Sequence, residues 1–392
     1  MTSQGKSRQL IPRHILFGNA ERASPQLSPD GRYLAWLAPV QGVLNVHLKD
    51  LSRDGDQDGH PVTFDRHRGI RSYLFARNCR HLLYVQDEDG DENWRLYCVD
   101  LSRIEADYVP AAVNLTPSNG VQVRIIATSI DRPDELVVGL NNEDPSRHDP
   151  YLLDLRTGEL NRLFRNPGLV GLVADRHLEV RAGALPGEDG SLRIFVRSGA
   201  GGGDPADLTS WRPVLEVPHE DALNTGVVGF DRAGESLLLL SSLGTNSTRL
   251  VEMDLTTGHE RILAEDPIYD ISAVHRNPVT RKVEMVGFRR ARQELVAVDP
   301  SVADDLAALL EPERGDLFIA TRTTDLSVWL VGYTRDRGPV EYYRYNRATR
   351  TRTFLFAHRP ELYDYELAAM EPFSYEAGDG WRIHGYLTFP PG

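Results

Sequence analysis

Four aspartates in one short segment have types and spacing that could bind a cation. Asp54, Asp56 and Asp58 alternate with other residues, and Asp65 follows at the twelfth position of the segment. This spacing matches the Asp-x-Asp-x-Asp-Gly pattern of a calcium loop, except that Asp65 stands where a bidentate Glu is usual. The flanking sequence does not predict helices, so an acidic, solvated loop between strands explains the segment equally well. Calcium binding is therefore a hypothesis with a simple alternative.

Patterns for covalent or metal-assisted hydrolysis do not occur in the 392 residues. No Gly-x-Ser-x-Gly elbow, which would expose a nucleophilic serine, is found in the chain. The histidines show neither His-x-His nor His-Glu-x-x-His spacing, so a catalytic zinc site has no support. Cys79 and Cys98 are too few and too far apart for a disulfide framework or a metal knuckle, and both are predicted to be free thiols. We predict no catalytic residue and no cofactor in this chain.

Composition excludes some classes of partner. The chain has 44 basic and 57 acidic side chains, a net charge of −13, and no Lys/Arg cluster that could follow a phosphate backbone. No apolar stretch approaches the 18 residues of a membrane span, and the first residues lack the apolar run of a secretory signal. We therefore expect a cytoplasmic protein that binds neither nucleic acid nor membrane, while its oligomeric state stays open.

The elements that must position any site form a repeat. Seven apolar runs of β type each lead, after a polar turn, to a second such run: Arg32–Leu37, His81–Val85, Glu135–Leu140, His177–Ala182, Ser236–Leu240, Lys282–Phe288 and Ser327–Gly332. The second runs end near Asp50, Asp100, Asp154, Arg197, Asp254, Asp299 and Asn346. The resulting period of about 49 residues is typical of β-propeller blades.

Short turns between these runs permit only antiparallel pairing, because a parallel crossover needs a longer connection. An inner strand within Ser24–Gly31 and outer runs such as Leu160–Phe164 and Glu260–Leu263 bring each blade to four strands. The fold class predicted is all-β, a seven-bladed propeller of four-stranded antiparallel blades. Positions predicted to pack between blades are Leu34, Trp36, Leu83, Val85, Val137, Leu238, Leu240, Val286 and Leu330.

Three regions are predicted along the chain: an N-terminal extension over 1–22, the propeller over 23–362, and a linker with the start of a further domain over 363–392. One short helix, Val302–Leu310, is predicted after Ser301 as its N-cap. The glycine-rich stretch Gly199–Gly203 is predicted to link the two outer strands of the fourth blade.

Three segments resemble the prolyl oligopeptidase family of serine peptidases, in its bacterial acylaminoacyl-peptidase and dipeptidyl-peptidase-like branch. These are Ile11–Asn19 running into Ser24–Pro39, Asp89-Gly-Asp-Glu-Asn-Trp-Arg-Leu-Tyr97, and Glu371–Gly392. In that family a seven-bladed propeller precedes an α/β-hydrolase domain, and Phe373–Pro391 resembles the first hairpin of the second domain. The resemblance implies that the catalytic Ser, Asp and His lie in a domain absent from these residues, so we expect an incomplete, truncated chain without activity of its own.

The resemblance also implies a substrate and a role for one acidic turn. The propeller would cap the active site of the hydrolase domain so that only short peptides or acyl-peptides reach it. A carboxylate of some propellers in this family holds the free amino terminus of the substrate, and Asp91 or Glu92 could do so here. The alternatives are a solvated turn around Gly90 and, for the whole chain, a free-standing propeller used as a binding scaffold.

Overall fold

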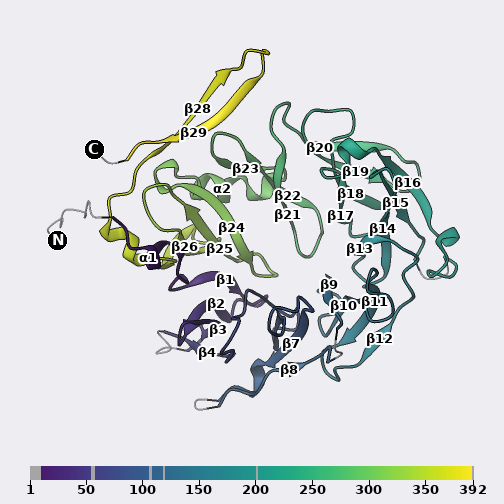
Figure 1. Cartoon of the computed structure of the whole chain (residues 1–392), viewed down its shortest axis with the longest axis horizontal. Coiled ribbons are helices and arrows are strands. Elements are labelled where there is room, and N and C mark those ends of the chain that lie inside the picture. Colours follow the sequence, from purple (N-terminus) through teal and green to yellow (C-terminus); the bar gives the residue numbers. More distant parts are fainter. Residues whose placement is uncertain (1–9, 54–57, 106–107, 118–119, 200–201, 391–392) are drawn as a thin grey trace.

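The strands of the chain form a ring of seven small antiparallel sheets around a central axis (Figure 1). The computed structural model describes residues 10–53, 58–105, 108–117, 120–199 and 202–390. Each sheet is one blade made of consecutive strands, and the first strand of each blade lies innermost. The predicted seven-bladed propeller is confirmed.

The first four blades have four strands each. They are β1 Ala23–Leu27, β2 Tyr33–Val40, β3 Val43–Asp50 and β4 His60–Pro61; β5 Ser72–Phe75, β6 His81–Gln86, β7 Arg95–Asp100 and β8 Val113–Asn114; β9 Val123–Thr128, β10 Glu135–Leu140, β11 Asp149–Asp154 and β12 Leu160–Arg162; and β13 Val170–Ala174, β14 Val180–Pro186, β15 Leu192–Val196 and β16 Arg212–Val217.

The remaining blades and the outlying elements complete the chain. They are β17 Gly226–Phe230, β18 Ser236–Ser241, β19 Arg249–Asp254 and β20 Glu260–Ala264; β21 Ile271–Arg276, β22 Val283–Arg289 and β23 Gln293–Ala297; β24 Asp316–Arg322, β25 Val328–Thr334, β26 Glu341–Asn346 and β27 Thr351–Ala357; the helices α1 Arg13–Phe17 and α2 Ala303–Leu309; and the hairpin β28 Met370–Glu376 with β29 Arg382–Thr388.

Blade 6 differs from the prediction of four strands in every blade, because its sheet in the described part of the chain has only three. After β23 the chain enters the 3-10 turn Pro300–Val302 and then helix α2. Proline lacks a donor for a fourth strand, and the Ala/Leu-rich sequence that follows favours a helix. The predicted cap is also corrected: the Asp299 side chain accepts the N–H of Ser301, so Asp299 caps the 3-10 turn.

The hydrophobic core is divided among the interfaces between blades. The described residues contain seven clusters of buried side chains, and each cluster joins two neighbouring blades. One of them joins blade 7 to blade 1. A single blade leaves its faces exposed, so stacking around the axis provides most of the burial. Leu34, Trp36, Leu83, Val137, Leu238, Val286 and Leu330 are buried as predicted, whereas Val85 and Leu240 are only partly buried.

One turn geometry recurs between the first and second strands of the blades. In six of the seven blades a residue of this turn has a left-handed backbone, with φ between 58° and 75°: Gly31, Cys79, Leu178, Gly234, Arg281 and Leu326. Glycine adopts this conformation without strain, whereas the other types pay a steric cost for it. Because the strands follow one another in the same order in every blade, these turns all lie at the same end of the ring. Residues at equivalent turn positions are therefore arranged around the axis.

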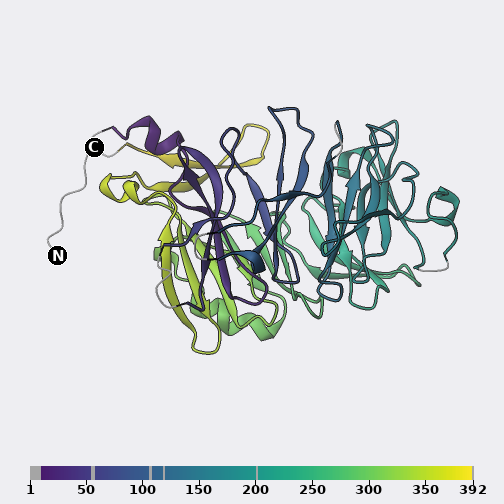
Figure 2. The same ribbon diagram turned by 90° about the horizontal axis from the view of Figure 1, so that it is seen from below.

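The ring has two distinct faces. Helix α1 and the hairpin β28–β29 lie on one face, and helix α2 lies toward the other (Figure 2). We call these the hairpin face and the far face. The hairpin contacts turns between second and third strands, since the Tyr386 hydroxyl lies 2.9 Å from the carbonyl oxygen of Ala291 and the Met370 N–H donates to Asp336. Second-to-third turns thus line the hairpin face, and first-to-second turns line the far face.

Candidate functional site

The acidic turn Asp87–Asn93 joins β6 to β7 and therefore lies on the hairpin face. Asp89, Gly90 and Glu92 all have a positive φ, between 54° and 84°. The Asp91 carboxylate accepts the backbone N–H groups of Glu88 and Asn93, both at 3.1 Å. These hydrogen bonds lower the pKa of Asp91 and hold the turn in its shape.

The two predicted carboxylates differ in what surrounds them. Asp91 also lies 3.3 Å from the Arg95 guanidinium, so its charge is already paired. Within the described residues the Glu92 carboxylate has no hydrogen bond and no ion pair; only its backbone carbonyl is engaged, by the side chain of Gln122 at 3.1 Å. A non-glycine residue with left-handed backbone is strained, and such strain often accompanies function. Of the two, Glu92 is the carboxylate free to take a ligand.

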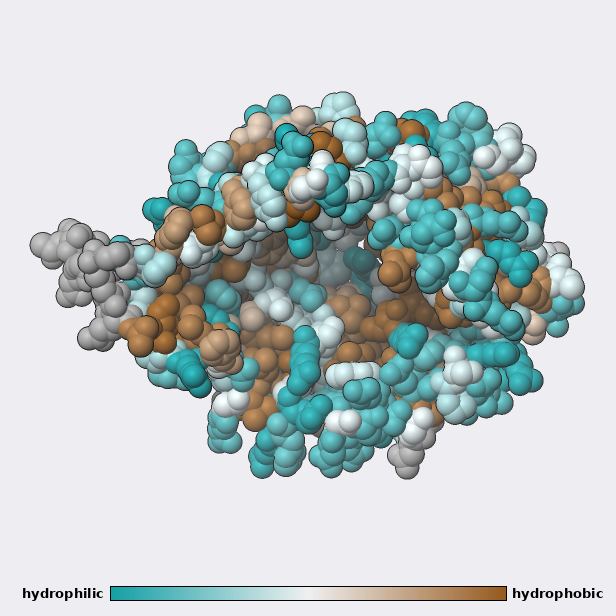
Figure 3. All heavy atoms as spheres, turned by 45° about the horizontal axis from the view of Figure 1, so that its top comes forward, coloured by the Kyte–Doolittle hydropathy of each residue, from teal (hydrophilic) through white to brown (hydrophobic). Residues whose placement is uncertain are grey.

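A pocket of about 480 Å³ adjoins this turn, between blades 2, 3 and 4. Asp91 and Glu92 line it together with Arg124, Arg147 and His148 of blade 3. Its volume lies within the range of about 300–1,000 Å³ that is usual for small-molecule sites. Figure 3 shows the ring hollowed near its centre, with apolar and polar residues both facing into the hollow. The pocket is lined by an unpaired carboxylate as well as by guanidinium groups.

His148 contributes a neutral ring to this pocket. Burial, together with the nearby Arg124 guanidinium, lowers the pKa of His148 to about 4, and its Nε2 atom is buried without a hydrogen-bond partner. At neutral pH the ring can therefore accept or donate one hydrogen bond without adding charge. Sequence reasoning missed Arg124, Arg147 and His148, because only the packing of blade 3 beside blade 2 brings them to the acidic turn.

The predicted calcium ligands lie partly outside the described residues, since Asp54 and Asp56 are not among them. The Asp58 side chain is 92% exposed and lies 3.9 Å from Arg22. The Asp65 carboxylate accepts the backbone N–H groups of Gly69 and His67, at 2.5 and 3.4 Å. In the described part of the chain, no group of three His, Cys, Asp or Glu side chains is arranged to hold a metal ion. Calcium binding stays an untested hypothesis.

The chain is similar in sequence to two dipeptidyl peptidases and in fold to the propeller region of solved prolyl oligopeptidases, which confirms the resemblance. The chain is 35% identical over 383 residues to the dipeptidyl aminopeptidase BIII of Pseudoxanthomonas mexicana, covering 97% of this chain and 53% of that protein. It is 26% identical over 387 residues to dipeptidyl peptidase family member 6 of Caenorhabditis elegans, covering 97% and 52%. The chain thus spans about half the length of these curated relatives.

Solved structures show the same fold at low identity. Prolyl oligopeptidase B of Galerina marginata aligns with a TM-score of 0.62 at 13% identity, over 94% of this chain and 55% of that one. A puromycin-hydrolyzing peptidase of Mycobacterium tuberculosis aligns with a TM-score of 0.62 at 14% identity, over 94% and 58%. No family model matches the chain. In the described residues, no helix is both long and apolar enough to cross a membrane.

Proposed function

We propose that this chain is the substrate-gating portion of a serine peptidase that acts on short peptides with a free amino terminus. The observation that carries the proposal is the unpaired Glu92 carboxylate beside a pocket on the hairpin face. A carboxylate binds an ammonium group through short, charge-assisted hydrogen bonds. Two relatives are named dipeptidyl peptidases, which favours a free amino terminus over an acylated one.

The remaining groups of the pocket suit the rest of a short peptide. Arg124 and Arg147 can donate hydrogen bonds to substrate carbonyl groups, and the neutral His148 ring can do so without repelling the ammonium group. An extended peptide could reach this pocket while a folded protein could not, if a second domain covered the hairpin face. The enzyme would therefore select its substrates by their size and by the positive charge at their amino terminus.

The hairpin β28–β29 is the proposed start of that second domain, after an N-terminal extension over 1–22 and a propeller over 23–362. Every residue of β28 is exposed, including Phe373 and Tyr375, and Trp381 and Phe389 are each 66% exposed. Apolar side chains gathered on one exposed element usually mark a surface that another element covers. No Gly-x-Ser-x-Gly occurs in the 392 residues, so we propose that the nucleophile belongs to the covering domain.

Steady-state kinetics of the complete enzyme would test the role of Glu92. For a chromogenic dipeptidyl anilide with a free amino terminus, Glu92→Gln should raise KM at least about tenfold and leave kcat nearly unchanged, since about 1.4 kcal/mol corresponds to a factor of ten. For the N-acetylated substrate, KM should be the same in Glu92→Gln and in the original enzyme. Asp89→Asn removes one charge from the same turn without touching the pocket, and serves as the control. An unchanged KM for Glu92→Gln would exclude this role.

The wider proposal has its own tests. The purified 392-residue chain should not hydrolyse the anilide, and hydrolysis abolished by a serine-directed inhibitor would contradict the assignment of the nucleophile. The coding frame beyond Gly392 separates the peptidase from a free-standing scaffold. Downstream His-Gly-Gly and Gly-x-Ser-x-Gly motifs support the peptidase, whereas a stop codon supports the scaffold or an enzyme divided between two chains.

A further inference from the structure

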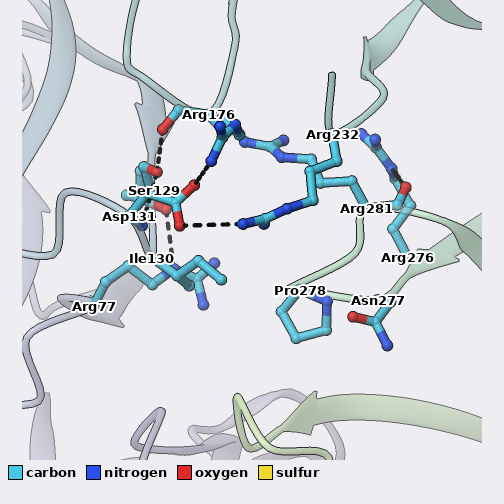
Figure 4. Close-up of a pocket in the computed structure, with 11 residues that line it drawn as sticks. Arg77, Ser129, Ile130, Asp131, Arg176, Arg232, Arg276, Asn277, Pro278 and Arg281 are labelled. Carbon is cyan, nitrogen blue, oxygen red and sulfur yellow. Dashed lines mark hydrogen bonds and ion pairs between the residues drawn. The ribbon is translucent and has the colours of Figure 1, made fainter. Parts of the chain in front are cut away.

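Five arginines surround one end of the axis on the far face. They come from the first-to-second strand turns of blades 2, 4, 5 and 6 and, for one of them, from the end of strand β21: Arg77, Arg176, Arg232, Arg281 and Arg276. They line a cavity of about 220 Å³ that we call the far-face mouth. The repeat explains the arrangement, since Arg77, Arg176 and Arg232 each lie two residues before the left-handed residue of their turns. Figure 4 shows these side chains around the mouth.

The positive charge of the mouth is poorly balanced. Asp131 is the single carboxylate among its lining residues, and it lies 2.9 Å from Arg176 and 3.9 Å from Arg232. In the part of the chain that the structure describes, no carboxylate lies within ion-pair distance of the other three arginines. The nearby Asp175 and Asp231 accept backbone N–H groups of their own turns, and Asp175 pairs with Arg181. Five guanidinium groups thus line the mouth with a single carboxylate, which already pairs with two of them, in a chain with a net charge of −13.

Two of the three arginines without a carboxylate donate hydrogen bonds to neutral groups instead. The Arg276 guanidinium donates to the carbonyl oxygens of Arg281 and Phe230, and Arg77 donates to the Thr128 hydroxyl at 3.2 Å. Burial and the neighbouring Arg281 lower the pKa of Arg276 to about 10, and both causes also lower the pKa of Arg77. The Arg77 side chain is exposed to solvent within the mouth. Gathering these cations without a counter-charge costs stability.

We propose that the far-face mouth binds a phosphate group, free or carried by a small molecule, which bridges the turns of blades 2, 4, 5 and 6. Guanidinium groups match the oxygens of phosphate as bidentate donors, and a doubly charged anion offsets two cations, whereas one carboxylate offsets a single cation. The cavity has the volume of roughly seven water molecules at about 30 Å³ each, which is room for the group and part of its hydration shell. Binding links four blades, so it should also stabilise the ring.

Isothermal titration of the 392-residue chain with inorganic phosphate would test the site, with sodium chloride added to keep ionic strength constant. Saturable binding is expected, together with a rise in Tm that grows with phosphate concentration. Arg77→Gln/Arg281→Gln should weaken phosphate at least about tenfold, since a hydrogen bond to a charged group contributes about 1.5–3 kcal/mol. Arg71→Gln/Arg289→Gln is the matched control, because both residues are exposed and lie at strand ends on the hairpin face.

A second variant changes affinity in the opposite direction. Asp131→Asn removes the competing carboxylate and should tighten phosphate binding about threefold or more, a gain that misfolding cannot produce. Pyrophosphate and phosphoserine in parallel titrations distinguish a free phosphate from one carried by an organic group. Absence of saturable binding to the unmodified chain, or equal affinity in the mouth variant and its matched control, would overturn the proposal.

Discussion

Arg322 and Glu284 form an ion pair buried between blades 6 and 7, with the Arg322 Nη1 atom 2.5 Å from Glu284 Oε2 and side chains only 9% and 3% exposed. The Glu284 carboxylate also accepts the side-chain amide of Asn277, and Arg322 donates to the backbone carbonyl of Arg276. The pair thus joins strands β22 and β24 to the turn that leads into the far-face mouth. Because both charges are removed from water, each charge depends on the other for its stabilisation.

Glu284→Gln should destabilise the propeller by about 3 kcal/mol, because it leaves the Arg322 charge buried without a partner. The glutamine can still accept the hydrogen bond from Asn277. The loss of stability therefore measures mainly the effect of removing the negative charge. Urea unfolding at neutral pH would measure the free energy of unfolding. The control is Glu252→Gln, which breaks an exposed pair with Arg261 and should cost less than about 1 kcal/mol. Equal effects of the two variants would contradict the importance of burial.

His275 should make stability depend on pH. Burial, aided by the Arg322 guanidinium, lowers the pKa of His275 to about 4. The unfolded chain binds this proton below about pH 6.5 and the folded chain only below about pH 4, so stability is full above pH 6.5 and falls as the pH drops through that window.

Unfolding free energies at pH 7 and pH 5 would measure the effect. The His275 contribution to the loss is at most about 2 kcal/mol, and His275→Gln should remove it. His47 and His148, each with a pKa lowered to about 4, keep part of the slope in this variant. His67→Gln, on an exposed segment, should retain the original slope. A pH dependence in His275→Gln that is no shallower than in the original chain would refute the assignment.

Removal of the hairpin should leave the ring folded. Deletion of residues 366–392 takes away the contacts of Tyr386 and Met370 with turns of blades 6 and 7, but no member of the seven interblade clusters. We expect a change in unfolding free energy below about 1 kcal/mol and reduced binding of an apolar dye, because Trp381 and Phe389 are exposed. A collapse of the unfolding transition on deletion would show that the hairpin is part of the propeller core.

Calorimetric titration with calcium should give no saturable heat. The Asp65 carboxylate already accepts two backbone N–H groups, and Asp58 projects into solvent beside Arg22. A cation would have to displace these hydrogen bonds, and the loop would supply only aspartates. Sub-millimolar binding that is lost in Asp58→Asn would instead establish the calcium loop.

Local sequence was sufficient to predict the blades. Alternating apolar residues and glycine or aspartate turns act within one repeat, so runs such as His81–Val85 coincide with observed strands. Contacts between repeats were not predictable in the same way. The far-face mouth and the pocket beside Glu92 each gather residues from several blades, and the sequence alone does not show which blades bring such residues together. Val85 and Leu240 fit the strand pattern, yet their exposure depends on neighbours that only the closed ring brings near.

The seam between blades 7 and 1 is built like the other six. Among the described residues, no strand from one end of the chain completes the sheet at the other end. Instead a buried cluster joins the two blades, and the Arg22 N–H lies 3.5 Å from the carbonyl oxygen of His358. Because the two ends of the propeller already meet there, the ring has no privileged starting point. A circularly permuted chain, with these ends joined and new termini between blades 3 and 4, should fold into the same propeller.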